Sequence, residues 1–504
     1  MTKTIAGLFA ARKADTARPF IIAADGSVRT YRAAYATSGR IANALVASGV
    51  KLGDRVAAQV EKSAEALLLY LACLRAGAVY LPLNTAYTLA EIEYFISDAE
   101  PKLVVVGPAA KAGIEPIARK HGAAAIETLA ADGTGSLMTL AKSQAETFTD
   151  VAAKPNDLAA ILYTSGTTGR SKGAMMSHWN LASNALTLVD FWKFTERDVL
   201  LHALPIFHTH GLFVASNVTI AAGSAMIFLP KFEPNEMFRH MPKATAMMGV
   251  PTFYTRLLDD ARLSKETAGH MRLFVSGSAP LLAETHRAWT ARTGHAILER
   301  YGMTETNMLT SNPYSDDRVP GAVGPALPGV SVRIANPETG AVLLAGEVGM
   351  IEVKGPNVFK GYWRMPDKTR AEFRPDGYFI TGDLGVIDNK GYVSIVGRGK
   401  DLVISGGFNV YPKEVETELD QLPGVLESAV IGIPHKDFGE GVVAVVVPQP
   451  GAKLDEKAMV KALEARLAKF KQPKRIIVVD TLPRNALGKV LKADLRKQYG
   501  ELFK

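Results

Sequence analysis

The sequence predicts an α/β protein with a large N-terminal domain of α/β layers, a β-rich subdomain and a small C-terminal α+β domain. Helical stretches alternate with short apolar runs such as residues 103–106, a pattern typical of parallel strands. Residues 328–362 contain shorter runs interrupted by glycine, which indicates the β-rich subdomain. A compact unit follows residues 397–401, with apolar runs and a helix expected over 455–471. We therefore expect domains at 1–399 and 400–504.

Length and composition restrict the function. A chain of 504 residues is too long for one ordinary core. The net charge of +8 favours anionic partners such as nucleotides, but we find no basic block with interleaved aromatics and expect no nucleic-acid partner. No apolar run reaches the roughly 18 residues that span a bilayer, so no membrane span is expected. The single cysteine, Cys73, excludes an intrachain disulfide and suits the cytoplasm.

A second series of apolar runs indicates further strands. They cover residues 158–162, 225–229, 273–275 and 296–298, and each ends near Gly, Ser or Pro. Ligand sites in α/β sheets lie beyond the strand ends, so the polar segments that follow these runs are candidate sites.

The segment 163–173 is the strongest of these candidates. Its glycines allow backbone N–H groups to approach an anion, while its hydroxyl groups and Lys172 supply further donors. The Walker pattern is not met, because Lys172 is followed by glycine and the glycine spacing differs. We interpret it as a phosphate-binding loop, with a flexible Gly/Ser/Thr loop as the alternative.

Three weaker segments carry complementary chemistry. Thr304 and Glu305, expected after the strand at 296–298, offer oxygen ligands suited to Mg²⁺, although a solvated loop is as good an interpretation. Asp383 and Arg398 could hold a ribose and an adjoining phosphate. Lys489 lies in a Gly-containing loop and, taken alone, would be an ordinary surface lysine.

Together, the order and contents of these four segments resemble the acyl-adenylate-forming family, which includes acyl-CoA synthetases, adenylation domains of peptide synthetases and firefly luciferase. The resemblance covers nearly the whole chain. Residues 204–212 and 299–308 look like the malonyl-CoA and methylmalonyl-CoA synthetase subfamily, as do 275–280 and 318–321. It implies ATP, Mg²⁺ and CoA as co-substrates or cofactors, and a C-terminal domain that moves between two half-reactions.

The resemblance also implies residue roles. The implied nucleotide contacts are Thr164, Ser165, Gly166, Thr167, Thr168, Gly169, Lys172, Gly277, Ser278, Ala279, Tyr301, Asp383 and Arg398. The implied CoA contacts are Gly406, Gly407 and Phe408. The implied catalytic residues are Lys489, Glu305, His208 and Thr304, the metal ligands are Glu305 and Thr168, and the hinge is Lys400. The implied acid pocket comprises Arg300, Ser278, Thr209, His210 and Met308.

Arg300 indicates which acid is used. An arginine next to Tyr301 offers a bidentate fork for a free carboxylate, which a long fatty acid would lack. The alternative is a structural ion pair with Glu299 or another acid. For His210, the alternative is a core histidine with a satisfied hydrogen bond.

The sequence therefore predicts a ligase that joins a small dicarboxylic acid, malonate or methylmalonate, to CoA through an acyl-adenylate. A CoA ligase for another short-chain or aromatic acid stays open, as does an enzyme that loads a separate carrier protein. A non-catalytic regulator would lack Lys489 or Glu305, and both are present. Family members are regulated by lysine acetylation, which implies an acetyltransferase or deacetylase acting on Lys489.

Overall fold

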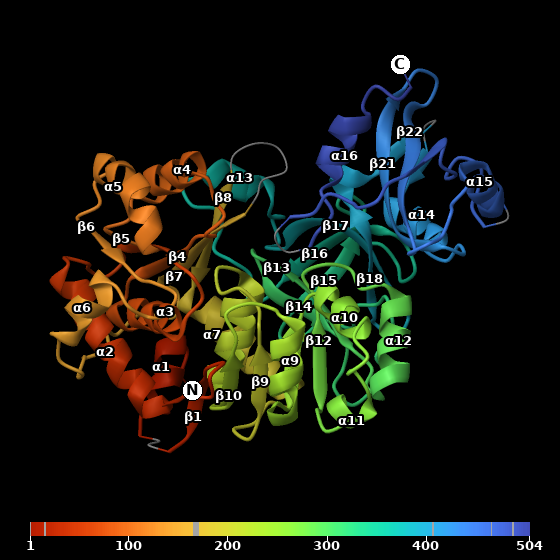
Figure 1. Ribbon diagram of the computed structural model, residues 1–504. Helices are drawn as coiled ribbons and strands as arrows, with labels where there is room; N and C mark the ends of the chain where they lie inside the picture. The colour runs from red at the N-terminus through yellow and green to blue at the C-terminus, as the bar shows by residue number, and fades with distance from the viewer. Residues whose placement is uncertain are drawn as a thin grey trace. The chain divides into compact units, whose positions relative to one another are not determined.

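The computed structural model describes residues 2–14, 17–164, 171–405, 408–464, 466–485 and 488–503. The chain forms two compact units (Figure 1). The first comprises Met1–Ser331 with Lys354–Phe379, and the second Val332–Val353 with Ile380–Lys504. Both contain helices and sheets, so the predicted α/β class is confirmed. The division expected from the sequence, 1–399 and 400–504, concerns a domain that moves and stays a prediction.

The first unit contains a six-stranded sheet in the order β6-β5-β3-β4-β7-β8. Its strands are β3 (Arg55–Gln59), β4 (Val79–Pro82), β5 (Leu103–Val106), β6 (Ala125–Thr128), β7 (Leu158–Thr164) and β8 (Lys172–Ser177). The first five pair in parallel, as the apolar runs predict. β8 returns antiparallel to β7, so the candidate phosphate loop joins two strands of a hairpin.

An eight-stranded sheet in the order β14-β13-β12-β11-β9-β10-β1-β2 completes the first unit. Its strands are β1 (Pro19–Ile22), β2 (Val28–Thr30), β9 (Val199–His202), β10 (Ala225–Phe228), β11 (Ala246–Gly249), β12 (Leu273–Ser276), β13 (Leu298–Met303) and β14 (Asn307–Ser311). Its interior pairs are parallel, and both edge pairs are antiparallel.

One strand prediction was wrong in a way that concerns the site. The expected strand 296–298 begins only at Leu298 and continues to Met303. Glu299, Arg300 and Tyr301 therefore lie on β13 and do not follow it. Successive side chains of a strand point to opposite faces, so Arg300 points away from both of its neighbours.

The helices of the first unit pack on these sheets. They are α1 (Ile5–Ala10), α2 (Tyr31–Ala47), α3 (Ala64–Ala76), α4 (Leu89–Ala99), η1 (Pro108–Ala110), α5 (Lys111–Lys120), α6 (Ser136–Lys142), α7 (His178–Phe191), η2 (His210–Ser216), α8 (Asn217–Ala222), α9 (Pro234–His240), η3 (Met241–Lys243), α10 (Pro251–Leu258), α11 (Lys265–Ala268), α12 (Ala283–Thr293) and α13 (Pro366–Ala371). α3 begins at the N-cap Ser63, and its residues are almost all apolar and buried, which fits a central helix.

The second unit contains two sheets. Strands β15 (Ser331–Ala335), β16 (Gly349–Lys354), β17 (Phe379–Ile387) and β18 (Val393–Arg398) form the predicted β-rich part. The other sheet contains β19 (Val403–Ser405), β20 (Phe408–Val410), β21 (Val425–His435), β22 (Gly439–Pro448) and β23 (Arg475–Val478). Its helices are η4 (Gly399–Asp401), α14 (Pro412–Leu419), α15 (Glu456–Glu464) and α16 (Lys492–Tyr499). The helix expected over 455–471 is thus shorter than predicted.

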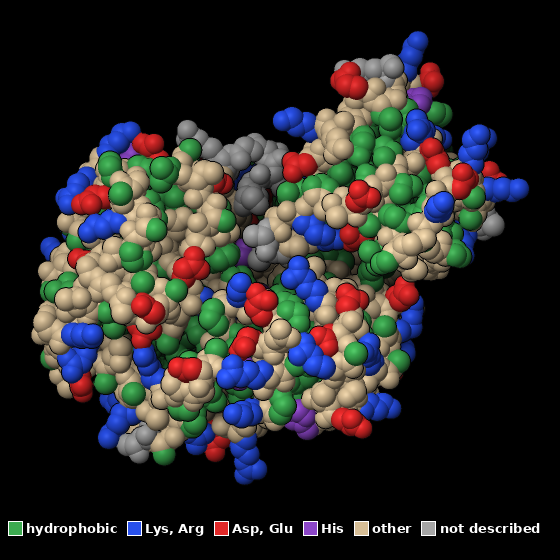
Figure 2. Space-filling view, in the orientation of Figure 1, with side chains coloured by type: hydrophobic (Ala, Val, Ile, Leu, Met, Phe, Trp, Pro, Cys, Tyr) green, Lys and Arg blue, Asp and Glu red, His purple; other side chains and the backbone are tan. Residues whose placement is uncertain are grey.

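Charged side chains of both signs lie on the surface. On the face in Figure 2, basic and acidic side chains are interspersed, and no single basic patch dominates. Among the helices that the structure describes, none is long and apolar enough to cross a membrane.

Candidate active site

Arg300 is a buried cation that forms no ion pair with the described residues. Its side chain is 3% exposed, and neither Nε nor Nη2 has a hydrogen-bond partner in the described part of the chain. Burial lowers the pKa of Arg300 to about 9, so the guanidinium is still charged at neutral pH. The neighbouring Glu299 contacts His286 Nδ1 at 2.9 Å and accepts from the Gly321 N–H. The expected alternative, an ion pair between Glu299 and Arg300, is therefore not what the structure shows.

The loop after β12 makes room for this guanidinium. A Cβ atom on Gly277 would lie 2.4 Å from Arg300 Cζ, so only glycine fits there without displacing Arg300. The next residue, Ser278, has a positive φ of 72°, a conformation that is strained for a side chain other than glycine. Its Oγ lies 3.2 Å from His210 Nδ1. The loop thus joins Arg300 to the segment that carries His210.

That segment contributes two further buried polar atoms without partners. Thr209 Oγ1 and His210 Nε2 are both buried, and the described residues offer neither a hydrogen bond. Burial, followed by the charge of Arg300, lowers the pKa of His210 well below its usual value, so the ring is neutral. A hydrogen bond donated by the Ser278 hydroxyl to Nδ1 leaves the proton on Nε2. The expected alternative of a satisfied core histidine therefore holds for one ring nitrogen and not for the other.

Two other predicted residues flank the same region. Burial lowers the pKa of His208 to about 4, which keeps it neutral. Met308 is 2% exposed on β14 and pairs in register with Gly302, where a Cβ atom would lie 2.7 Å from Met308 Cε. The structure therefore brings most of the predicted acid pocket together around β13, β14 and the loop after β12.

The predicted phosphate and metal residues form a different kind of cluster. Lys172 Nζ contacts Glu372 Oε1 at 3.0 Å, and Lys368 contacts the same oxygen at 2.9 Å. The Tyr362 hydroxyl lies 2.6 Å from Glu372 and 3.0 Å from Glu305. Burial raises the pKa of Glu305, which is 5% exposed. In contrast to Arg300, every charged group here has a partner.

Two members of this cluster were missed by sequence reasoning. Tyr362 and Glu372 are more than fifty residues from Glu305 in sequence, and Glu372 is 200 residues from Lys172. A lone tyrosine and a lone glutamate carry no local motif, so only the fold could place them beside the predicted residues.

Parts of the predicted nucleotide and CoA sites lie outside the described residues. These positions are Ser165, Gly166, Thr167, Thr168, Gly169, Gly406 and Gly407. The flanking residues Thr164 and Lys172 are opposite each other in the β7–β8 register. Tyr301 is 7% exposed on β13, Ala279 follows Ser278, and Thr304 lies in the turn between β13 and β14.

In the second unit, the predicted ribose and adenylation residues lie near one another. Arg398 Nε contacts Asp383 Oδ1 at 2.8 Å, across the β17–β18 register. Burial of the ammonium, followed by the charge of Arg398, lowers the pKa of Lys489 to about 8, although the residue as a whole is exposed. Burial likewise lowers the pKa of Lys400. Phe408 is exposed and stacks on Phe470, with ring centroids 4.7 Å apart.

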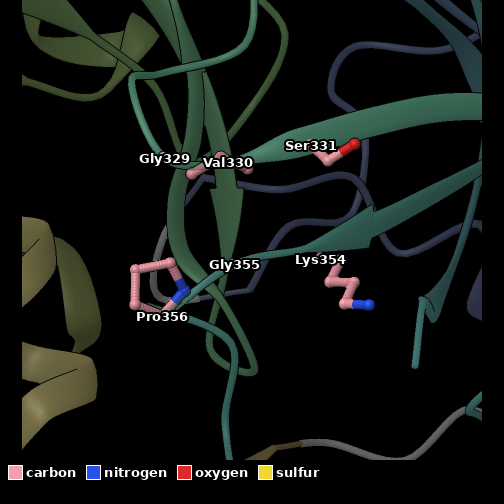
Figure 3. Close-up of a pocket in the computed structure, with 6 residues that line it drawn as sticks. All are labelled: Gly329, Val330, Ser331, Lys354, Gly355 and Pro356. Carbon is pink, nitrogen blue, oxygen red and sulfur yellow. The ribbon is translucent and has the colours of Figure 1, made fainter. Parts of the chain in front are cut away.

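A separate open pocket of about 540 Å³ lies beside β16 (Figure 3). It is lined by Gly329, Val330, Ser331, Lys354, Gly355 and Pro356. None of the predicted site residues lines it, so we assign it no part in the site.

Comparison with known families agrees with this geometry. The model described as "AMP-binding enzyme" matches residues 9–363, and that of the "AMP-binding enzyme C-terminal domain" matches 414–489. The chain belongs to the AMP-binding enzyme family. The family predicted from the sequence is thereby confirmed.

Several members of this family are similar over most of their length. A malonate–CoA ligase from Arabidopsis thaliana is 36% identical over 88% of this chain and 78% of the relative. A mitochondrial malonate–CoA ligase from Mus musculus is 34% identical over 93% of this chain and 86% of the relative. The crystal structure of ATP-bound MatB from Rhodopseudomonas palustris is 65% identical, with a TM-score of 0.96, over 99% of this chain and all of that one (100%).

Proposed function

We propose that this protein is an ATP-dependent malonate–CoA ligase that also accepts methylmalonate. Malonate and ATP would give malonyl-adenylate and diphosphate, and CoA would then give malonyl-CoA and AMP. The observation that carries this proposal is the buried guanidinium of Arg300, whose Nε and Nη2 have no hydrogen-bond partner among the described residues. A buried charge without a partner is costly, so the site favours a ligand that supplies a fixed negative charge.

The polar atoms around Arg300 match a carboxylate. Arg300 Nε and Nη2, His210 Nε2 and Thr209 Oγ1 are all able to donate, and none has an acceptor in the part of the chain that the structure describes. A carboxylate has about four lone-pair sites and accepts from an arginine fork in bidentate fashion. The free carboxylate of malonate would therefore satisfy these donors, while the other carboxylate is activated.

The alternative acids fit this pocket less well. Acetate, a fatty acid or benzoate would leave Arg300 unpaired in a buried site, with the loss of binding that an unmet charge entails. Methylmalonate keeps both carboxylates and adds one methyl group, whose space Met308 would limit. An enzyme that loads a carrier protein would share the adenylation step and differ only in the acceptor thiol.

The residues of the nucleotide side are compatible with Mg²⁺-ATP. Glu305 presents a buried carboxylate, a hard oxygen ligand of the type that Mg²⁺ prefers, and Thr168 is the second ligand that we propose. When bound, Mg²⁺ would neutralise phosphate charge. Lys172 would contact the phosphates, Tyr301 would lie against adenine, and Asp383 with Arg398 would hold the ribose. These groups position the α-phosphorus for attack by the carboxylate.

Lys489 supplies the charge needed while diphosphate leaves, and the C-terminal domain is proposed to turn about Lys400 before CoA enters past Phe408. Lys489→Ala should therefore abolish ATP–diphosphate exchange but leave thioester formation from supplied malonyl-AMP largely intact. Acetylation of Lys489 should have the same effect, because it removes the charge.

Proline at position 400 would fix φ near −65° and should damage one half-reaction, thioester formation, far more than the other. Equal losses in both half-reactions would contradict these roles.

The proposal is tested by ATP–diphosphate exchange and CoA consumption across a panel of acids. We expect malonate to give the highest kcat/KM, methylmalonate to be accepted, and acetate to fall about 100-fold or more below malonate. Acetate or octanoate matching malonate would overturn the assignment. Exchange with malonate but no CoA consumption would favour the carrier-loading alternative. The single cysteine leads us to propose a cytoplasmic location, which fractionation of the native cell would test.

A further inference from the structure

A buried lysine–histidine pair lies next to the acid pocket and has no role in the proposed reaction. Lys62 is 8% exposed, and its Nζ lies 3.1 Å from His202 Nδ1 and 2.8 Å from the His202 carbonyl oxygen. The Nζ also lies 4.2 Å from the centre of the Phe228 ring. No carboxylate among the described residues forms an ion pair with Lys62. Lysine is almost never fully buried unless it is paired, and here the pairing is with His202.

The pair joins the two sheets of the first unit. Lys62 lies between the end of β3, in the six-stranded sheet, and the N-cap of α3. His202 is the last residue of β9, in the eight-stranded sheet. Both therefore lie beyond or at the carboxyl ends of parallel strands, where ligand sites of α/β folds are built.

The hydrogen bonds of the pair have one consistent direction. The amine of Lys62 donates to Nδ1, so the proton of the neutral imidazole is on Nε2. Nε2 lies 3.0 Å from the Gly211 carbonyl oxygen, to which it donates. The Ser216 hydroxyl donates to the same oxygen at 2.9 Å. Burial lowers the pKa of Lys62 and of His202 well below their usual values, yet a neutral lysine still donates, so the chain of bonds persists.

The carbonyl at the end of this chain belongs to the residue after His210. Gly211 is the second residue of η2, a π-helix, and such helices are rare and frequent at functional sites. A Cβ atom on Gly211 would lie 2.0 Å from the Pro205 carbonyl oxygen, so the segment is tightly packed there. Holding this carbonyl fixes the Gly211–Leu212 peptide, which follows His210 directly, and so restricts the backbone that carries His210 and Thr209.

We infer that Lys62 and His202 are positioning residues for the acid pocket, because they hold the Gly211 carbonyl and thereby aim Thr209 and His210 at the free carboxylate of the substrate. The inference rests on the proposed function for the identity of the acid. It does not place either residue in contact with substrate. Their loss should weaken acid recognition and leave nucleotide recognition unchanged.

The experiment compares His202→Leu, His202→Gln and Lys62→Met with the wild type in ATP–diphosphate exchange, with KM determined separately for malonate and ATP. We expect His202→Leu to raise the malonate KM by about tenfold or more, with the ATP KM within about twofold. Gln places an amide near the Nε2 position, so His202→Gln should recover most of the loss. The preference for malonate over acetate should fall with His202→Leu and recover with His202→Gln.

Two further variants keep the inference falsifiable. Tyr31→Phe removes a buried hydroxyl that contacts the Thr219 and Ser224 carbonyls, and it serves as the control for a structural loss, with both KM values unchanged. If His202→Leu does not fold, Ser216→Ala tests the inference instead. It removes the second donor to the Gly211 carbonyl and should raise the malonate KM about two- to threefold. A malonate KM that stays unchanged in the folded variants overturns the inference. Failure of the wild type to use malonate would instead overturn the proposed function, and the same variants would then be assayed with the acid that it activates best.

Discussion

The acid side and the nucleotide side of the site handle their charges in opposite ways. Around Arg300, buried donors lack acceptors in the described protein. Around Glu305, the charged groups pair with one another through Tyr362, Glu372 and Lys172. The proposed acid pocket therefore presents donors to an anion before it binds, whereas on the proposed nucleotide side Mg²⁺-ATP would have to displace internal partners. Around Arg300, preorganised donors favour specificity for the ligand. Around Glu305, internal pairing lowers the free-energy cost of burying charged groups when no ligand is bound.

Replacing Arg300 should have the largest effect on the malonate KM. Arg300→Leu removes the cation that the free carboxylate is proposed to meet, so the malonate KM should rise about 100-fold or more. The ATP KM should stay within about twofold, because no ATP contact is changed. Arg300→Lys is the matched control: it keeps a charge but loses the fork, and an intermediate KM is expected. An unchanged malonate KM in Arg300→Leu would assign Arg300 a purely structural role.

The pH dependence should separate the two half-reactions. A lysine whose pKa is lowered is charged below that value, so Lys489, with a pKa of about 8, loses its charge as the pH rises through 8. Diphosphate exchange at subsaturating ATP and malonate, where the rate reports the groups of the free enzyme, should fall roughly tenfold between about pH 7 and pH 9. Thioester formation from supplied malonyl-AMP should change much less over the same range. A parallel decline of both reactions would show that Lys489 does not set the limit.

The smallest effect is expected from Glu372→Gln. Neutralising Glu372 releases Lys172 and removes a negative charge beside the proposed phosphate site, so the ATP KM should fall about two- to fivefold. The malonate KM should not change. Glu100→Gln, which disrupts an exposed ion pair with Arg364 in the same unit, is the control with no change expected. A higher ATP KM in Glu372→Gln would mean that the pair with Lys172 assists nucleotide binding.

The residues of the proposed acid pocket were chosen from the sequence, but the sequence did not predict the bounds of the strand that carries Arg300. The apolar run ends at Leu298, and the charges of Glu299 and Arg300 favour a loop. In the structure both are buried on β13, where Glu299 contacts His286. The compensating partner lies outside the segment, so local polarity gave the wrong boundary.

Residues that are far apart in the sequence but in contact in the structure also could not be predicted. Lys62 and His202 are separated by 140 residues, and neither belongs to a recognisable motif. Tyr362 and Glu372 are similar cases. Motifs carry information about residues that touch a common ligand, whereas these four residues act on other side chains or backbone, and only the pairing of distant strands brings them into place.

Ser278 shows how stability and recognition compete at one backbone position. A serine with a φ of 72° carries strain on the order of 1 kcal/mol that glycine would relieve. Glycine would also lose the hydroxyl that contacts His210 Nδ1, and with it the reason for the proton to stay on Nε2. Selection for thermal stability alone would therefore favour glycine at position 278. The resulting enzyme would be more thermostable but would have a weaker preference for dicarboxylic acids. Engineering for robustness should leave this position fixed and seek its gains elsewhere in the fold.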